Sequence, residues 1–193
     1  MASEPLDTEI SEASTAPRPS GVGSHLLAIS LALVGGVLGI AGAFVQELPA
    51  AAGLLLLPFL GAPIIEEGVK PIGVYILLMR WPHLLRGRLY TAALAGLAGL
   101  VFGVLESLVY VKLYVPDPSD AFVTYRFTVP LAVHALASFT VGLGVNQGVL
   151  AWAKGEAALP KASRNLFIAA VTLHAVFNIT GFVLVVTGVV DLD

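Results

Sequence analysis

The sequence predicts an all-α protein, a polytopic bundle of about five transmembrane helices. Of its 193 residues, 57% are hydrophobic and only 12% are charged, which is about half the charged fraction of a soluble domain. The mean hydropathy is +0.89. Apolar stretches of about 20 residues, the length that crosses a bilayer, recur along the chain. These observations place the chain in a lipid bilayer.

Residues 1–24 are rich in serine, proline and glutamate and contain almost no large apolar side chain. Such a segment cannot bury a core, so we expect a disordered acidic tail followed by a single transmembrane helical domain over residues 25–193. The tail begins with acidic residues, and the apolar run after it is too long for the core of a signal peptide. We therefore do not expect a signal peptide.

Four of the predicted spans follow directly from apolar composition. The first is free of charge over twenty residues, and each of the other three contains a single acid or histidine. These spans cover residues 26–45, 89–111, 127–152 and 165–190.

The remaining span, roughly residues 49–79, is too long for a straight helix across the bilayer. At about 1.5 Å per residue, such a helix exceeds the apolar core and must tilt, kink or break. Pro58, Gly61 and Pro63 mark the expected break. Residues 49–60 alone are too short to cross, so five spans are favoured over a six-segment alternative.

Basic residues cluster in two connections, between the second and third spans and between the fourth and fifth. The opposite connections mix charges of both signs, and the C-terminus is acidic. The positive-inside rule then predicts a cytoplasmic N-terminus and an external C-terminus. The clustered residues are Arg80, Arg86, Arg88, Lys154, Lys161 and Arg164.

Glycines recur at helical spacing inside the spans and predict close approach of helix backbones. The alternative, that glycine is simply common in membrane helices, stays open for each set. The sets are Gly35 with Gly39, Gly144 with Gly148, and Gly96 with Gly99 and Gly103.

Ionisable side chains interrupt the spans, and each acid or lysine near the middle costs about 2.5–3.5 kcal/mol to insert. Four such groups would cost about 10 kcal/mol if each stood alone. We therefore expect these groups to pair with one another. They are Glu66, Glu67, Lys70, Glu106, His134 and His174.

The spacing of these groups allows the pairing. Glu66 and Glu67 precede Lys70 by four and three residues, so all three share one side of a helix. We expect the polar faces to meet in one water-filled pocket that opens outward. The same four-residue step joins Phe102 to Glu106, His174 to Asn178, and His134 to Ser138, Gly142 and Asn146.

Paired carboxylates beside histidines suit general acid–base chemistry. Glu66 or Glu67 would take a proton from water, while the histidines and Asn178 would polarise a carbonyl and stabilise the oxyanion. Lys70 would keep one carboxylate ionised. This combination predicts a hydrolase, acting on a peptide bond presented inside the membrane.

Four motifs in this order resemble the PrsW family of intramembrane proteases, within the clan of type II CAAX prenyl proteases and bacteriocin self-immunity proteins. They are EEGVK (Glu66–Lys70), FGVLE (Phe102–Glu106), HALASFTVG (His134–Gly142) and HAVFN (His174–Asn178). They match EExxK, FxxxE, HxxxxxxxG and HxxxN. The CAAX branch usually has arginine and histidine where this chain has Lys70 and Glu106, which favours PrsW. Many PrsW relatives end the last motif in aspartate, where Asn178 stands here.

The resemblance implies cleavage of a single-pass membrane protein, such as an anti-sigma factor, near the outer face of a prokaryotic plasma membrane. The catalytic residues it implies are Glu66, Glu67, Glu106, His134 and His174, supported by Lys70, Phe102, Ser138 and Asn178.

Several alternatives stay open. We favour a glutamic mechanism without a cofactor, because the chain has no HExxH motif. Zinc, if present, would bind Glu67, Glu106, His134 and His174. A non-catalytic scaffold or immunity-type protein is a second function, and a proton-coupled carrier is a third, although no inverted repeat supports the carrier. The net charge of −3 gives no footprint for nucleic acid, and without cysteine there is no thiolate metal site.

Overall fold

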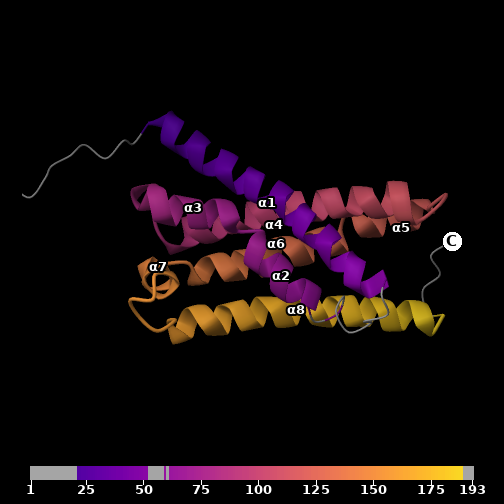
Figure 1. The fold of residues 1–193 in the computed structure, drawn as a ribbon. Coiled ribbons are helices and arrows are strands. Elements are labelled where there is room, and N and C mark those ends of the chain that lie inside the picture. The colour runs from indigo at the N-terminus through magenta and orange to yellow at the C-terminus, as the bar shows by residue number, and fades with distance from the viewer. Residues whose placement is uncertain (1–20, 52–58, 60, 189–193) are drawn as a thin grey trace, which may run out of the picture.

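The computed structural model describes residues 21–51, 59 and 61–188, and within them every regular element is a helix. Most of the predicted tail lies outside the described residues. The first helix begins at Val22, slightly before the tail was expected to end. The polytopic helical bundle predicted from the sequence is thereby confirmed (Figure 1).

Within the residues that the structure describes, four segments are long and apolar enough to cross a membrane. They correspond to α1 and α8, to α4 with the π-helical turn that continues it, and to α5 with α6. The long helices are α1 (Val22–Ala51), α4 (Arg88–Val109), α6 (Val129–Gly144) and α8 (Lys161–Val186). The short elements are η2 (Pro82–Leu84), η3 (Tyr110–Tyr114), α5 (Asp120–Arg126) and α7 (Gln147–Ala153).

The remaining predicted span is broken into α2 (Ala62–Val69) and α3 (Ile72–Arg80). Pro63 lies in the first turn of α2, where proline is well tolerated, and Pro58 lies outside the described residues. A further break at Pro71 was not predicted. It separates two helices of 8 and 9 residues, because proline has no N–H for the helical ladder.

The fourth predicted span also differs from the structure. The expected single helix over residues 127–152 ends at Gly144, and α7 follows it. The Asn146 side chain accepts hydrogen bonds from the N–H groups of Gly148 and Val149 and so caps α7. Asn146 is therefore exposed at the end of the bundle rather than part of a polar stripe with His134.

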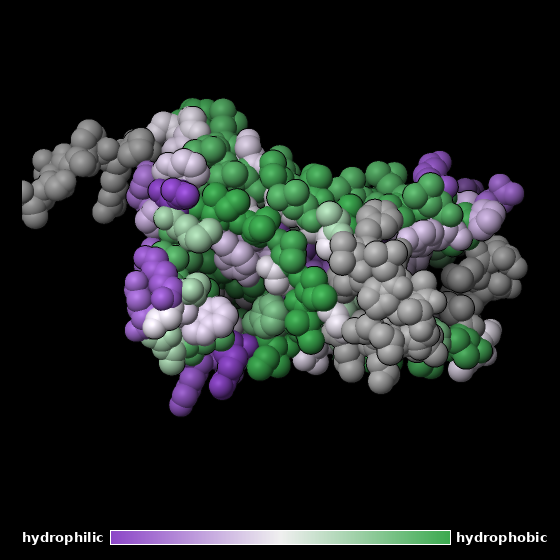
Figure 2. All heavy atoms as spheres, in the orientation of Figure 1, coloured by the Kyte–Doolittle hydropathy of each residue, from purple (hydrophilic) through white to green (hydrophobic). Residues whose placement is uncertain are grey.

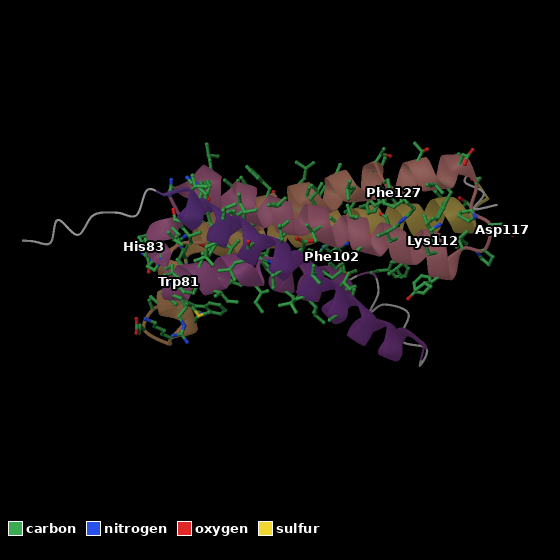
Figure 3. The ribbon with its side chains drawn as sticks, turned by 90° about the horizontal axis from the view of Figure 1, so that it is seen from above. Trp81, His83, Phe102, Lys112, Asp117 and Phe127 are labelled. Carbon is green, nitrogen blue, oxygen red and sulfur yellow. The ribbon has the colours of Figure 1, made fainter. Side chains whose placement is uncertain are left out.

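The helical passes alternate in direction, so the start of α1 and the end of α8 lie at opposite ends of the bundle (Figure 1). The α3–α4 and α7–α8 connections share the end at which α1 begins. Trp81 and His83 lie there, and Lys112 and Asp117 lie at the other end (Figure 3). Between the two ends, the face seen in Figure 2 is largely hydrophobic, as expected for a surface in contact with lipid.

Glycines let the helices that carry the polar motifs approach one another, as predicted. A methyl group on Gly35 of α1 would lie 2.7 Å from the carbonyl oxygen of Lys70. One on Gly99 of α4 would collide with the His134 carbonyl oxygen, and one on Gly103 would lie 3.2 Å from the His134 ring. Close contact of α4 with α6 therefore depends on the absence of side chains on this face.

Candidate active site

Polar side chains from α2, α4, α6 and α8 meet in the interior of the bundle. Glu67 and Lys70 are 0% exposed, His134 and His174 are 1% exposed, and Glu66 is 5% exposed. Burying so many polar groups is costly unless they bind one another. The structure brings all five together, as the spacing of the motifs predicted.

Lys70 is the centre of this cluster. Its Nζ donates to Glu67 Oε1 at 2.7 Å and to His134 Nδ1 at 3.0 Å, and it lies 3.2 Å from Glu66 Oε2. The ammonium also lies 4.0 Å from the centre of the buried Phe102 ring, a favourable cation–π arrangement. Lys70 is the C-cap residue of α2, so the break at Pro71 places its side chain among the other three helices.

Glu67 has partners on both of its oxygen atoms. Oε1 accepts from Lys70 and from Nδ1 of His174, the latter at 3.0 Å. Oε2 accepts from the Ser138 hydroxyl at 3.0 Å. The Glu67 carboxylate thereby links α2 to α6 and α8, and it fixes the orientation of the His174 ring.

His134 is held from both sides by charged groups. Its Nδ1 accepts from Lys70, and its Nε2 lies 3.0 Å from Glu106 Oε2. Since lysine only donates, Nε2 carries the proton that His134 donates to Glu106. The ring edge of His134 packs against Phe102, with centroids 4.9 Å apart, and its ring lies 4.7 Å from that of His174.

Glu66 differs from the other members of the cluster. Its Oε2 atom is buried and has no hydrogen-bond partner among the described residues. His174 Nε2, the ring nitrogen that Glu67 does not use, lies 3.7 Å from this oxygen. A carboxylate oxygen that accepts no hydrogen bond, although the Lys70 ammonium lies 3.2 Å away, and an imidazole nitrogen therefore face each other across a short gap.

Arg126 is a member of the site that the sequence reasoning missed. In the sequence it is one of the mixed charges of the connection before the fourth predicted span, but it is 8% exposed at the end of α5. Its Nη2 donates to Glu106 Oε2 at 2.7 Å, and its guanidinium lies 3.9 Å from the Tyr110 ring centre. The sequence did hold a signal for this pairing. Arg126 is an arginine directly before an apolar span, and the preceding span contains Glu106, an acid with no basic partner at helical spacing within that span.

Asn178 lies one turn beyond His174 on α8 and is half-buried. Within the part of the chain that the structure describes, its side chain makes no hydrogen bond to the cluster. The other two supporting residues do contact the cluster, as the motifs predicted. Ser138 contacts Glu67, and Phe102 contacts Lys70 and His134.

A family model of PrsW family intramembrane metalloproteases matches residues 21–191, which include all four motifs. The chain belongs to the PrsW family. No curated protein and no solved structure matches the chain. Membership of PrsW confirms the resemblance drawn from the motifs, and it supports an intramembrane protease in a membrane-spanning helical bundle.

The PrsW family is described as one of metalloproteases. Within the described residues, one set of donor atoms could hold a metal ion. Glu66, His134 and His174 each offer a ligand atom, and these atoms lie within 4.8 Å of one another. Two imidazoles and a carboxylate form a known catalytic zinc ligand set. The unbonded Oε2 of Glu66 agrees with this fit.

This donor set differs from the expected one, which included Glu67 and Glu106 in place of Glu66. Those two carboxylates instead bind His174 and His134, one ring nitrogen on each. Carboxylates commonly orient metal-binding histidines in this way. The Lys70 ammonium contacts two of the three donors itself, so an ion here would have a positive charge as its neighbour.

Proposed function

We propose that the chain is an intramembrane endopeptidase that hydrolyses a peptide bond of a single-pass membrane protein, with Glu66 as the base. The observation that carries this proposal is the buried, unbonded Oε2 of Glu66 beside His174. This oxygen lies 3.2 Å from the Lys70 ammonium but accepts no hydrogen bond, so a water molecule could donate one to it. Membership of the PrsW family supplies the reaction class.

Glu66 and Glu67 have different tasks in this mechanism, although they are neighbours in the sequence. Glu67 accepts three hydrogen bonds, and both of its oxygen atoms already have a partner within the cluster. Glu66 takes a proton from the water molecule while the water oxygen attacks the carbonyl carbon of the scissile bond. The proton then passes to the nitrogen of the leaving amine as the C–N bond breaks.

Positive charge and hydrogen-bond donors stabilise the oxyanion that forms in this step. The Lys70 ammonium lies in the cluster at 3.2 Å from Glu66 Oε2, where the surroundings are dry and electrostatic effects are strong. Asn178, one turn from His174, offers an amide N–H that the cluster itself does not use. Glu106 and Arg126 act indirectly, since they hold the His134 ring in place.

A zinc ion would be held by Glu66, His134 and His174. When bound, such an ion lowers the pKa of its water and polarises the carbonyl. Glu67 and Glu106 would then orient the two imidazoles through their other nitrogen atoms. We favour the glutamate-based reaction, because Lys70 already supplies a positive charge that contacts two of these donors.

The charge distribution supports cleavage near the outer face, with the N-terminus in the cytoplasm. The clustered arginines and lysines lie at one end of the bundle, which the positive-inside rule assigns to the cytoplasm. Within the site, the Glu106 side chain is 20% exposed, whereas that of Glu66 is 6% exposed. Glu106 lies near the end of α4 opposite to the basic residues, so the site opens outward.

Quantitative proteomics of membrane fractions tests the proposal. Cells that contain Glu66→Gln should accumulate a full-length single-pass protein, an anti-sigma-factor-like protein among the candidates, that the wild type cleaves. Glu156→Gln changes an exposed glutamate after α7 and is the matched control. Cleavage that persists in Glu66→Gln, at normal abundance of the variant, would refute the proposal. A chelator in the same assay separates the glutamate-based reaction from a zinc-dependent one.

A further inference from the structure

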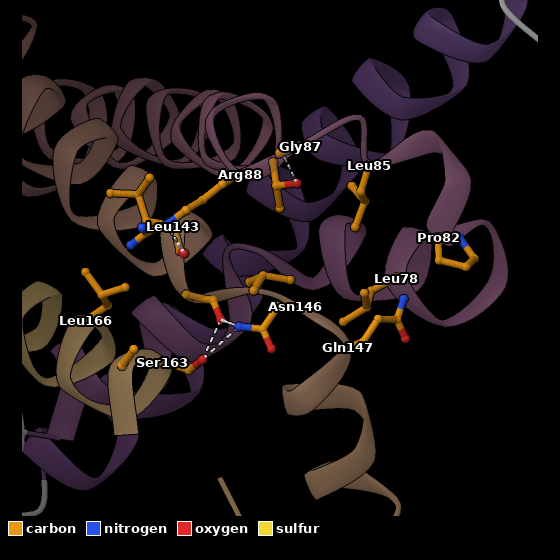
Figure 4. Close-up of a pocket in the computed structure, with 14 residues that line it drawn as sticks. Leu78, Pro82, Leu85, Gly87, Arg88, Leu143, Asn146, Gln147, Ser163 and Leu166 are labelled. Carbon is orange, nitrogen blue, oxygen red and sulfur yellow. Dashed lines mark hydrogen bonds between the residues drawn. The ribbon is translucent and has the colours of Figure 1, made fainter. Parts of the chain in front are cut away.

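A cavity of about 490 Å³ lies at the basic end of the bundle, away from the proposed active site (Figure 4). The cavity is open on one side, and it is lined by the end of α3 and the turn after it, the start of α4, the end of α6, and the starts of α7 and α8. No residue of the active-site cluster lines this cavity. Its volume lies in the range of sites that bind small molecules.

One wall of the cavity is polar and rigid. The Ser163 hydroxyl donates to the Gly144 carbonyl at 2.7 Å, and the Asn146 amide donates to Ser163 at 3.1 Å. Arg88 reaches across to α6 and donates from Nε to the Leu143 carbonyl at 3.0 Å (Figure 4). A guanidinium has five N–H donors, and the other four have no partner among the described residues. Arg88 is exposed, and no carboxylate in the described residues forms an ion pair with it.

The remaining lining is apolar. Leu78, Leu85 and Leu166 come from three different parts of the fold and face the same space (Figure 4). Val145 also lines the cavity. A small soluble anion leaves such a wall in contact with water, whereas a molecule with both a charged and an apolar part covers it. The cavity therefore fits an amphipathic ligand better than a free ion.

Depth and charge both indicate a lipid. Trp81 and Trp152 are exposed at this end of the bundle, and tryptophan is enriched at the level of lipid headgroups. Six arginines and lysines lie in the two connections at this end, against one acid, Glu156, in the described residues. Basic pockets between membrane helices on the cytoplasmic side attract anionic headgroups.

We propose that this cavity binds an anionic phospholipid of the cytoplasmic leaflet. The free N–H groups of Arg88 bind the phosphate, and Asn146 and Gln147 bind the polar headgroup beside it. The leucine and valine side chains contact the glycerol backbone and the first carbons of the acyl chains. The lipid thereby joins the starts of α4 and α8 to the end of α6. This site does not depend on the proteolytic function.

Native mass spectrometry of the full chain, released from nanodiscs of equimolar phosphatidylglycerol and phosphatidylcholine, tests the proposal. The wild type should retain phosphatidylglycerol in preference to phosphatidylcholine. Arg88→Gln should weaken that retention about fivefold, the effect of one surface cation on an anionic lipid. Arg80→Gln removes an exposed cation at the same end that does not line the cavity, so it should retain the lipid as the wild type does.

Ala162→Phe provides a second variant, because it fills the cavity without a change of charge. It should also lose the retained lipid, so the test does not depend on Arg88→Gln folding normally. Equal retention of both lipids by the wild type, or an equal loss in Arg80→Gln and Arg88→Gln, would overturn the proposal. Complete displacement of the lipid by millimolar inorganic phosphate would overturn it too, because the site would then bind a free anion.

Discussion

Replacement of Lys70 by methionine is the perturbation that most directly probes the polar cluster. Methionine keeps the length of the side chain and its contact with Phe102, but it removes the ammonium. Glu67 then loses a 2.7 Å hydrogen bond and Glu66 loses its 3.2 Å ion pair. Removal of one partner from a buried ion pair costs about 3–5 kcal/mol. We expect a loss of stability of that size.

Thermal unfolding of the purified chain in detergent micelles measures this loss. For a chain of 193 residues, each kcal/mol changes the melting temperature by about 2–4 °C, so Lys70→Met should melt about 6–20 °C below the wild type. The control is Lys161→Met, an exposed lysine at the start of α8. That variant should lie within about 0.5 kcal/mol of the wild type.

A double variant identifies the cause of the loss. Glu67→Gln removes one of the two carboxylates that Lys70→Met leaves without a counter-ion. The combination should therefore recover at least about 1 kcal/mol relative to Lys70→Met alone, since residues in contact are not additive. Strictly additive effects, or a loss below about 1 kcal/mol in Lys70→Met, would refute the reasoning that the acids depend on this lysine.

Three further predictions concern other parts of the bundle. Arg126→Gln, at normal abundance of the variant, should slow cleavage of the single-pass protein that accumulates in Glu66→Gln cells at least about tenfold, because Glu106 loses its 2.7 Å partner. An unchanged cleavage rate in the membrane assay would contradict this. Ser138→Ala leaves Oε2 of Glu67 without its donor and should cost about 1–3 kcal/mol in thermal unfolding, and a neutral variant would count against the bond. Gly99→Val should prevent α4 from packing against α6 and greatly reduce the amount of folded protein, measured as the non-aggregated peak in size-exclusion chromatography in detergent; a peak of wild-type size would contradict this.

Much of the fold and of the polar cluster was predictable, because a bilayer leaves few choices. Apolar runs of bilayer length must be helices, and isolated charges within them are costly enough to pair. The convergence of Glu67, Lys70 and His174 followed from these two constraints. The close approach at Gly99 followed from the need for small residues where helices touch.

The breaks in the helices were harder to predict. Prolines at positions 58, 63 and 71 all mark potential break points, and the sequence reasoning considered only the first two. Pro71 interrupts the helix because it has no N–H for the helical ladder, and the break leaves Lys70 at the end of α2. The consequence, that Lys70 meets the other helices there, appears only in three dimensions. In the same way, Asn146 begins a new helix with its side-chain cap, although the apolar pattern continues past it.

The roles within the site also depend on geometry. Glu66 and Glu67 are chemically identical neighbours, and only the arrangement of α6 and α8 decides which one keeps an unbonded oxygen. Besides His134, Glu106 has a partner in Arg126, twenty residues away, and that pairing depends on how α5 folds back onto α4. Neither distinction corresponds to a periodic pattern in the sequence.

The most direct test of the central claim is the single-turnover cleavage rate of the identified substrate by the purified chain in proteoliposomes. The wild type and Glu66→Gln are compared after both are shown to melt at similar temperatures. If Glu66 activates the water in a site shared by four helices, its rate should fall about 10²–10⁴-fold in the variant. A rate within a few-fold of the wild type would contradict the claim.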